Sequence, residues 1–60
     1  MWNGRIIEVV GEYLAWMDEL KSKYPDKSFE WLGGEKPKKF PYAVQWIVDE
    51  KYINYKIINL

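Results

Sequence analysis

The first regular pattern in the chain is a stripe of apolar side chains with the spacing of an α-helix. Six of them recur at intervals of three or four residues, so a helix would present them on one side: Ile6, Val10, Tyr13, Met17, Leu20 and Tyr24. Glu19 and Lys23 form a favourable i to i+4 pair, and Pro25 ends the helix. The pattern predicts a helix from Val10 to Lys23.

The residues before this helix have a different character. Four β-branched residues occur close together, at Ile6, Ile7, Val9 and Val10. Gly11 would weaken the interior of a helix by about 1 kcal/mol. We therefore expect a short edge strand over roughly residues 4–8. A single helix that begins after Asn3 as its N-cap is the alternative.

Three later segments alternate apolar and polar side chains with the two-residue period of a β-strand: residues 27–32, 42–48 and 53–57. Asp49-Glu50-Lys51 is polar and of hairpin length, so the last two segments are predicted to form a β-hairpin. A helix from Tyr42 to Lys51, with Pro41 at its first position, is the alternative.

Between the first and second of these strands the composition is that of a loop. Gly33-Gly34 is expected to end the first strand. Residues 33–41 contain two Gly, two Pro and three Lys, which is typical of an irregular, solvated segment.

These elements predict an α+β fold in the order β-α-β-β-β, with one amphipathic helix packed on a small antiparallel sheet. Residues 1–60 are expected to form a single small domain. The side chains expected to face the helix from the sheet are Phe29, Trp31, Val44, Trp46, Val48, Ile53, Tyr55 and Ile57.

The small size of the chain makes its aromatic residues important. A domain of about 60 residues hides only about 60% of the surface that its unfolded chain exposes. The chain has no Cys and no His, so neither disulfides nor zinc sites of the usual kinds can reinforce it. Its 4 Trp, 5 Tyr and 2 Phe are the main core material. Some of these rings should face outward, either at a dimer or partner interface or as the cover of a thin core.

Charge and hydropathy narrow the classes of partner. The 9 Lys and Arg balance the 9 Asp and Glu, which argues against a dominant nucleic-acid-binding surface. No apolar run has the length of a membrane span, and the N-terminus lacks the basic-then-apolar order of a signal peptide. We therefore expect a cytoplasmic protein with no membrane partner.

The residue types that most readily carry out catalysis are missing. Without His and Cys there is no easily tuned acid, base or thiolate, and no Ser-His-Asp triad. Ser22 and Ser28 are the only hydroxyls besides those of tyrosine, and neither lies in a nucleophile elbow. The adjacent carboxylates at residues 18–19 and 49–50 suit a solvated surface. We expect a non-enzymatic protein without catalytic residues, cofactor or metal.

Candidate binding residues are the loop lysines, the rings beside them and the tryptophans expected at the surface. Three nearby lysines give the only concentrated charge in the chain, and they stand next to two aromatic residues. This mixture resembles the sites that bind single-stranded nucleic acid, where bases stack on rings and lysines contact phosphates. The candidates for partner binding are Trp2, Trp31, Lys36, Lys38, Lys39, Phe40 and Tyr42.

Residues 6–35, IIEVVGEYLAWMDELKSKYPDKSFEWLGGE, resemble the opening of FRG domains. In that family a short strand and an amphipathic helix lead into a strand that ends in aromatic-x-Arg-Gly, and residues 31–35 (WLGGE) would fill this slot. Gly33 stands where the family has its arginine, and the chain is shorter than an FRG domain, so no functional residue is carried over. The resemblance implies a fragment or miniature relative, found among bacterial and phage genes, that is used for binding.

We therefore expect a small protein–protein interaction or inhibitor protein, encoded by a phage or mobile element, that binds a larger host protein. A second copy of the chain is a further expected partner. The alternative is a small nucleic-acid-binding module that uses Lys36, Lys38, Lys39 and the nearby rings.

Overall fold

One helix and four strands follow one another in the predicted order. The computed structural model describes residues 1–33 and 35–60, and of Gly34 only its place in a strand. The elements are β1 (Asn3–Ile7), α1 (Val10–Lys23), β2 (Ser28–Gly34), β3 (Tyr42–Val48) and β4 (Tyr52–Asn59). The α+β class and the bounds of the helix are confirmed. Both helical alternatives, one at the N-terminus and one after Pro41, are wrong.

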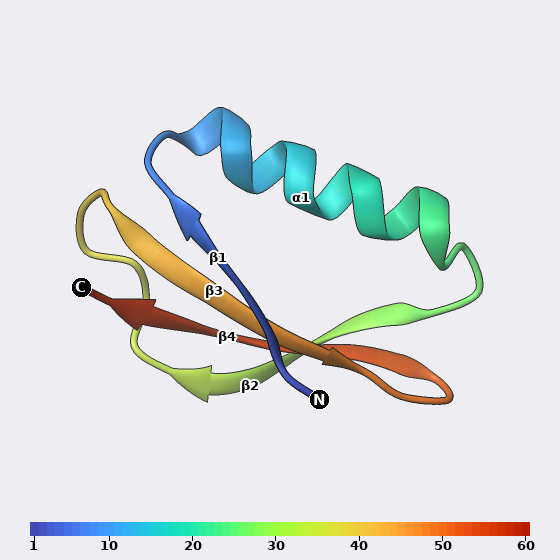
Figure 1. Cartoon of the computed structure of the whole chain (residues 1–60). Helices are drawn as coiled ribbons and strands as arrows, with labels where there is room; N and C mark the ends of the chain where they lie inside the picture. Colours follow the sequence, from blue (N-terminus) through green and yellow to red (C-terminus); the bar gives the residue numbers. More distant parts are fainter.

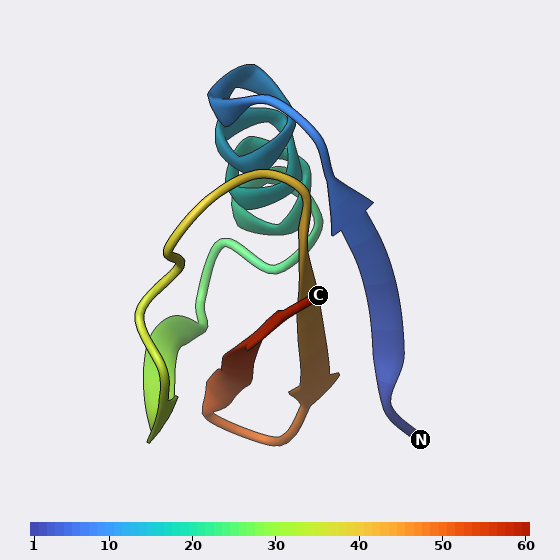
Figure 2. The same ribbon diagram turned by 90° about the vertical axis from the view of Figure 1, so that its left-hand side faces the viewer.

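The structure has two layers, with α1 lying across one face of the sheet (Figure 1). The strand order is β1-β3-β4-β2, so the C-terminal hairpin forms the middle of the sheet and β1 and β2 form its edges. The view along the helix in Figure 2 shows the strands in this order below α1. No other element of the described residues covers the opposite face.

The sheet is mixed, whereas the sequence pattern predicted an antiparallel one. β1 pairs with β3 and β3 pairs with β4 in antiparallel fashion, but β2 runs parallel to β4. A parallel neighbour cannot be reached through a tight turn and requires a longer connection. Here the loop after β2, the whole of β3 and the β3–β4 turn separate β2 from its parallel neighbour β4 along the chain. The helix α1 connects the two edge strands, β1 and β2, and the hairpin lies between them.

β2 also extends beyond its predicted end, through both glycines. Gly33 has a φ of +87°, a backbone angle that glycine adopts without strain. The register between β2 and β4 shifts between Trp31 and Gly34. This irregularity bends the strand without ending it, and an irregular edge is a poor template for pairing with another chain.

Aromatic rings around Trp16 form the centre of the core. Trp16 is 0% exposed, and its ring centroid lies 5.4–5.6 Å from those of four other rings: Tyr13, Phe29, Trp46 and Tyr55. All four ring pairs are tilted or edge-on, as aromatic pairs prefer. The indole N–H of Trp16 is buried and has no hydrogen-bond acceptor among the described residues.

The buried side of α1 is rotated from the predicted stripe. Trp16 and Leu20 are its buried residues, Tyr13 and Met17 are half-buried, and Val10 is exposed. Burial raises the pKa of Tyr13 to about 12, and a hydrogen bond with the Tyr55 hydroxyl adds to this shift.

The predicted helix-facing side of the sheet is largely confirmed. Four of its eight residues are buried, and Phe29, Val48 and Tyr55 are half-buried against them. Ile7 and Tyr42 complete the core from β1 and β3. The remaining residue, Trp31, packs against Tyr55 on the same side, but it lies on an edge strand and stays 40% exposed.

Asp49 fixes the turn of the β3–β4 hairpin. Its carboxylate accepts hydrogen bonds from the backbone N–H groups of Tyr52 and Lys51 and from the side chain of Asn54. These bonds, the one from Tyr52 first, hold the pKa of Asp49 below its usual value of 3.8. The ammonium of Lys27 donates to the carbonyl oxygens of residues 49 and 50, which ties the turn to the start of β2.

We expect Trp16→Ala to remove about 3–5 kcal/mol from the free energy of unfolding, most of the stability of a domain this small. Trp16→Phe should cost clearly less, because it keeps a ring in the cluster and deletes an N–H that has no acceptor. Urea and thermal denaturation measure both. Leu14→Ala, on the exposed side of α1, is the control and should stay within about 0.5 kcal/mol of the parent. Equal losses for Trp16→Ala and Leu14→Ala would contradict this view of the core.

Asp49 should make stability depend on pH in the acid range. Its pKa is lower in the folded than in the unfolded chain, so its contribution is present above about pH 4 and is lost as the pH falls through the folded-state pKa. The parent should therefore exceed Asp49→Asn in free energy of unfolding at about pH 7, and the difference should shrink as the pH falls below about 4. Urea titrations at several pH values test this. A difference that stays constant, or one that Asp18→Asn on the surface of α1 reproduces, would show that the turn hydrogen bonds are not its source.

Candidate binding site

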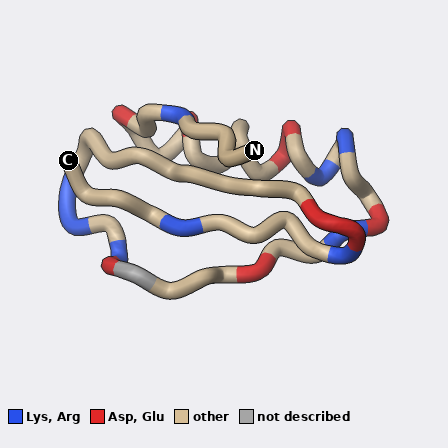
Figure 3. The backbone as a smooth tube through the Cα atoms, turned by 60° about the horizontal axis from the view of Figure 1, so that its bottom comes forward, with Lys and Arg blue, Asp and Glu red and all other residues tan. Residues whose placement is uncertain are grey.

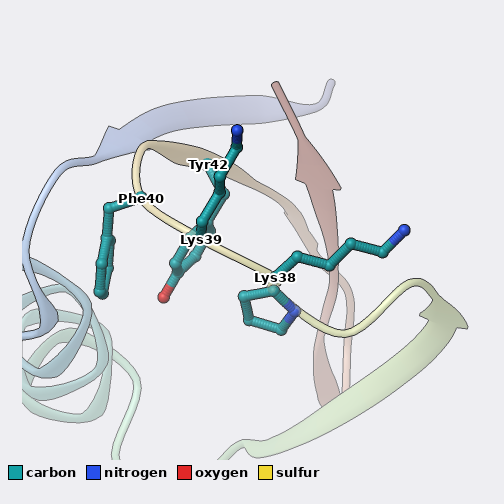
Figure 4. A pocket seen from close by; sticks show the side chains of 5 residues that line it. Lys38, Lys39, Phe40 and Tyr42 are labelled. Atoms are coloured by element: carbon teal, nitrogen blue, oxygen red, sulfur yellow. The ribbon is translucent and has the colours of Figure 1, made fainter.

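Five side chains at one end of the molecule surround an open depression of about 250 Å³ (Figure 4). They come from the β2–β3 loop and the start of β3: Pro37, Lys38, Lys39, Phe40 and Tyr42. We call these five residues the loop site. Four of the predicted binding residues are thus brought together by the fold, and Lys36 lies beside them without lining the depression.

Two stacked rings form the apolar part of the loop site. Tyr42 is buried and begins β3, where its backbone pairs with Ile7 on one side and Asn59 on the other. Phe40 stacks on it with 5.3 Å between ring centroids and 28° between planes, and remains 45% exposed. Burial also raises the pKa of Tyr42, so its hydroxyl stays neutral at physiological pH. The site therefore presents an outer ring supported from behind by a fixed one.

Asn59, at the end of β4, holds the loop against the sheet. Its side-chain oxygen accepts from the backbone N–H of Lys38 at 3.0 Å. Its NH₂ group donates to the Glu35 carboxylate at 2.9 Å and to the Lys36 carbonyl at 3.2 Å. One amide thus fixes three successive parts of the loop. Sequence reasoning missed this residue, because nothing in the alternating pattern of β4 shows that its last polar side chain meets a loop.

The lysines give this end of the molecule a local positive charge. Figure 3 shows the loop lysines gathered beside the C-terminus, at the end of the molecule away from the β3–β4 turn. Lys38 lies 3.6 Å from the Glu35 carboxylate, but both side chains are largely exposed, so this ion pair contributes little. The loop site can therefore offer ammonium groups to an anionic partner at little cost.

The two tryptophans predicted to bind a partner lie elsewhere. Trp31 is on the helix side of edge strand β2, beside Tyr55. Trp2 is 44% exposed on the opposite face, where the ammonium of Lys56 lies 4.9 Å from its ring centroid. No single flat partner surface could therefore contact both Trp2 and Trp31. A part for either in binding stays a prediction.

The groups at the loop site suit binding. They are ammonium groups, rings and backbone amides, which contact carboxylates, phosphates and apolar side chains. Within residues 1–33 and 35–60 no three acidic side chains are placed to hold a metal ion. Over the same residues, no helix has both the length and the apolar character needed to cross a membrane.

In comparisons with known proteins, no protein-family model, no curated protein and no solved structure matches this chain. The resemblance of residues 6–35 to FRG domains stays a prediction. Ideas about function therefore depend on the geometry of the chain itself.

Asn59→Ala should loosen the loop without unfolding the domain. The backbone N–H of Lys38 loses its acceptor, so its hydrogen exchange should accelerate at least tenfold, and proteases should cut the loop faster. Asn54→Ala is the matched control, because it removes the same side chain from the other end of β4. Unchanged exchange at Lys38 in the Asn59 variant would show that the loop is held by other contacts.

Proposed function

We propose that this chain is a small, non-enzymatic protein that binds a larger protein through the loop site. The observation that carries the proposal is Phe40, an aromatic ring that is nearly half exposed although it stacks on a buried ring beside an open depression. Aromatic side chains in such positions are the residues that most often dominate protein–protein binding energy.

The loop is already ordered before a partner arrives. Asn59 holds residues 35–38, and Tyr42 belongs to the sheet. Binding therefore does not have to supply the free energy that ordering a flexible loop would cost. An ordered loop of this kind favours binding to a partner surface whose shape already matches it. Binding in which the loop folds around the partner is less favoured.

The partner should present an apolar side chain flanked by carboxylates. The apolar group would enter the depression beside Phe40, and the carboxylates would meet Lys38 and Lys39. The exposed apolar residues Val10 and Leu14 on the first turns of α1 would extend this surface, since both Figure 1 and Figure 2 place the loop beneath this end of the helix. An inhibitor would act by occupying such a surface on its target, and a phage or mobile-element origin stays a prediction.

Binding of single-stranded nucleic acid is the second candidate. It is supported by two lysines beside stacked rings, because a base could stack on Phe40 while the ammonium groups contact phosphates. If Lys36 joins Lys38 and Lys39 in contacting phosphates, the logarithm of the affinity would fall with the logarithm of the salt concentration with a slope of about −2. Ring burial against a protein would depend on salt much less.

Affinity capture with paired variants tests the proposal. The parent, Phe40→Ala and Tyr52→Ala are immobilised and exposed to extract of the source host, and bound proteins are quantified by mass spectrometry. Tyr52 is an exposed ring at the far end of β4, so it controls for non-specific aromatic contacts. We expect one protein that the parent and Tyr52→Ala retain and that Phe40→Ala loses at least tenfold, with all three variants folded by circular dichroism.

A Lys38→Ala/Lys39→Ala double variant, used beside the parent, separates the two candidates. Fluorescence anisotropy with single-stranded DNA and RNA oligonucleotides measures nucleic-acid binding directly. Salt-sensitive binding that disappears in a Lys38→Ala/Lys39→Ala double variant, together with no Phe40-dependent protein in the extract, would replace the protein-binding proposal by the nucleic-acid one. If Phe40→Ala captures the same proteins as the parent, the loop site is not the recognition surface.

A further inference from the structure

About half of the side chains on the face of the sheet away from α1 are apolar, although a solvated face is usually polar. In sheets of this kind one face packs on the core and the other carries polar side chains. Here Ile6 and Ile58 are exposed on the outer face, on either side of Ala43 in one cross-strand row. Trp2 and Tyr52 add two exposed rings to the same face.

This outer face is also poor in charge. Among its strand residues only Glu30 on β2 and Lys56 on β4 are charged, and Figure 3 shows most charged residues on the helix, the turns and the loop. Neither forms an ion pair with another described residue of the chain. A face that combines exposed aromatic rings with few charges is typical of protein interfaces.

We propose that a second copy of this chain covers the outer face, related by a two-fold axis that crosses the strands. The axis would lie between the row that contains Gln45 and Lys56 and the row that contains Ile47 and Asn54. This dimer uses none of the loop-site residues, so it is independent of the proposed function and would leave both loop sites free.

The two-fold axis makes the face complementary to itself. It places Lys56 of each copy beside Glu30 of the other, so the one cation and the one anion are both matched. It also places Ile58 on Tyr52 of the second copy. Trp2 comes to lie over Gly4 of the second copy, where no side chain is in the way.

The size of the face fits a weak dimer. Four strands about 4.8 Å apart and about seven residues long at ~3.4 Å each span roughly 450 Å². Two such faces, with the relief of their side chains, reach the lower end of the ~1,200–2,000 Å² that stable interfaces bury. Two sheets pack in this way about 10 Å apart, which Lys and Glu side chains together can span. We therefore expect dissociation constants in the micromolar range.

Analytical ultracentrifugation from about 1 μM to 1 mM tests the dimer. Ile58→Lys should raise the dissociation constant at least tenfold, because it puts a cation into the apolar row and a second one on the outer face. Leu14→Lys is the matched control: it makes the same change at an exposed residue of α1 and should leave association unchanged. A parent that stays monomeric over the whole range, or a Leu14→Lys variant that loses association as Ile58→Lys does, overturns the proposal.

A charge-swap mixture tests the two-fold arrangement itself. The Lys56→Glu chain carries two anions on the face and the Glu30→Lys chain two cations, so each alone should associate at least tenfold more weakly than the parent. Mixed in equal amounts they should form a heterodimer close to parental strength. If the mixture stays as weak as its components, Lys56 and Glu30 do not face each other and the arrangement is wrong. A monomeric chain that still captures a Phe40-dependent protein would refute the dimer alone, and a dimer without such capture would refute the loop-site function alone.

Discussion

The fold depends on the burial of one indole ring. A chain of this length has too little interior to hold a helix on a sheet through many small contacts, and it has neither Cys nor His to replace them. Trp16 fills this role by meeting rings from three strands at once: Phe29, Trp46 and Tyr55. Because these rings lie in the core, few aromatic rings remain exposed. The positions of the exposed rings indicate the surfaces where a partner can bind.

Local sequence patterns predicted where the helix and strands lie along the chain, but not which strands pair with each other. The bounds of α1, the alternation of β3 and the polar turn at Asp49 follow from spacing along the chain. The parallel pairing of β2 with β4 does not, because alternation tells which side chains share a face but not which strand lies beside another. The predicted stripe omits Trp16, because it starts from Ile6, which belongs to β1, and Val10, which is exposed.

The loop site shows the same limit. Composition alone brought Lys38, Lys39, Phe40 and Tyr42 together as candidates, and the fold gathers them around one depression. What orders them could not be predicted, since Asn59 lies more than twenty residues from Glu35 along the chain. The two ends of the β3–β4 hairpin thus differ in use. One end is a turn held by Asp49 and Lys27, and the other supports the loop whose ring Phe40 faces solvent.

The strand order β1-β3-β4-β2 has a kinetic consequence. β1 and β2 cannot pair with each other, because the hairpin lies between them. While the chain is being synthesised, its first half therefore emerges with both strands unpaired, and the sheet can close only when residues 42–59 have followed. Folds dominated by pairing between distant segments form slowly for their size. β3 and β4 are the neighbouring strands joined by a short turn, so sheet formation can start from this hairpin. The C-terminal residues, which are synthesised last, then provide the strands beside which β1 and β2 pair.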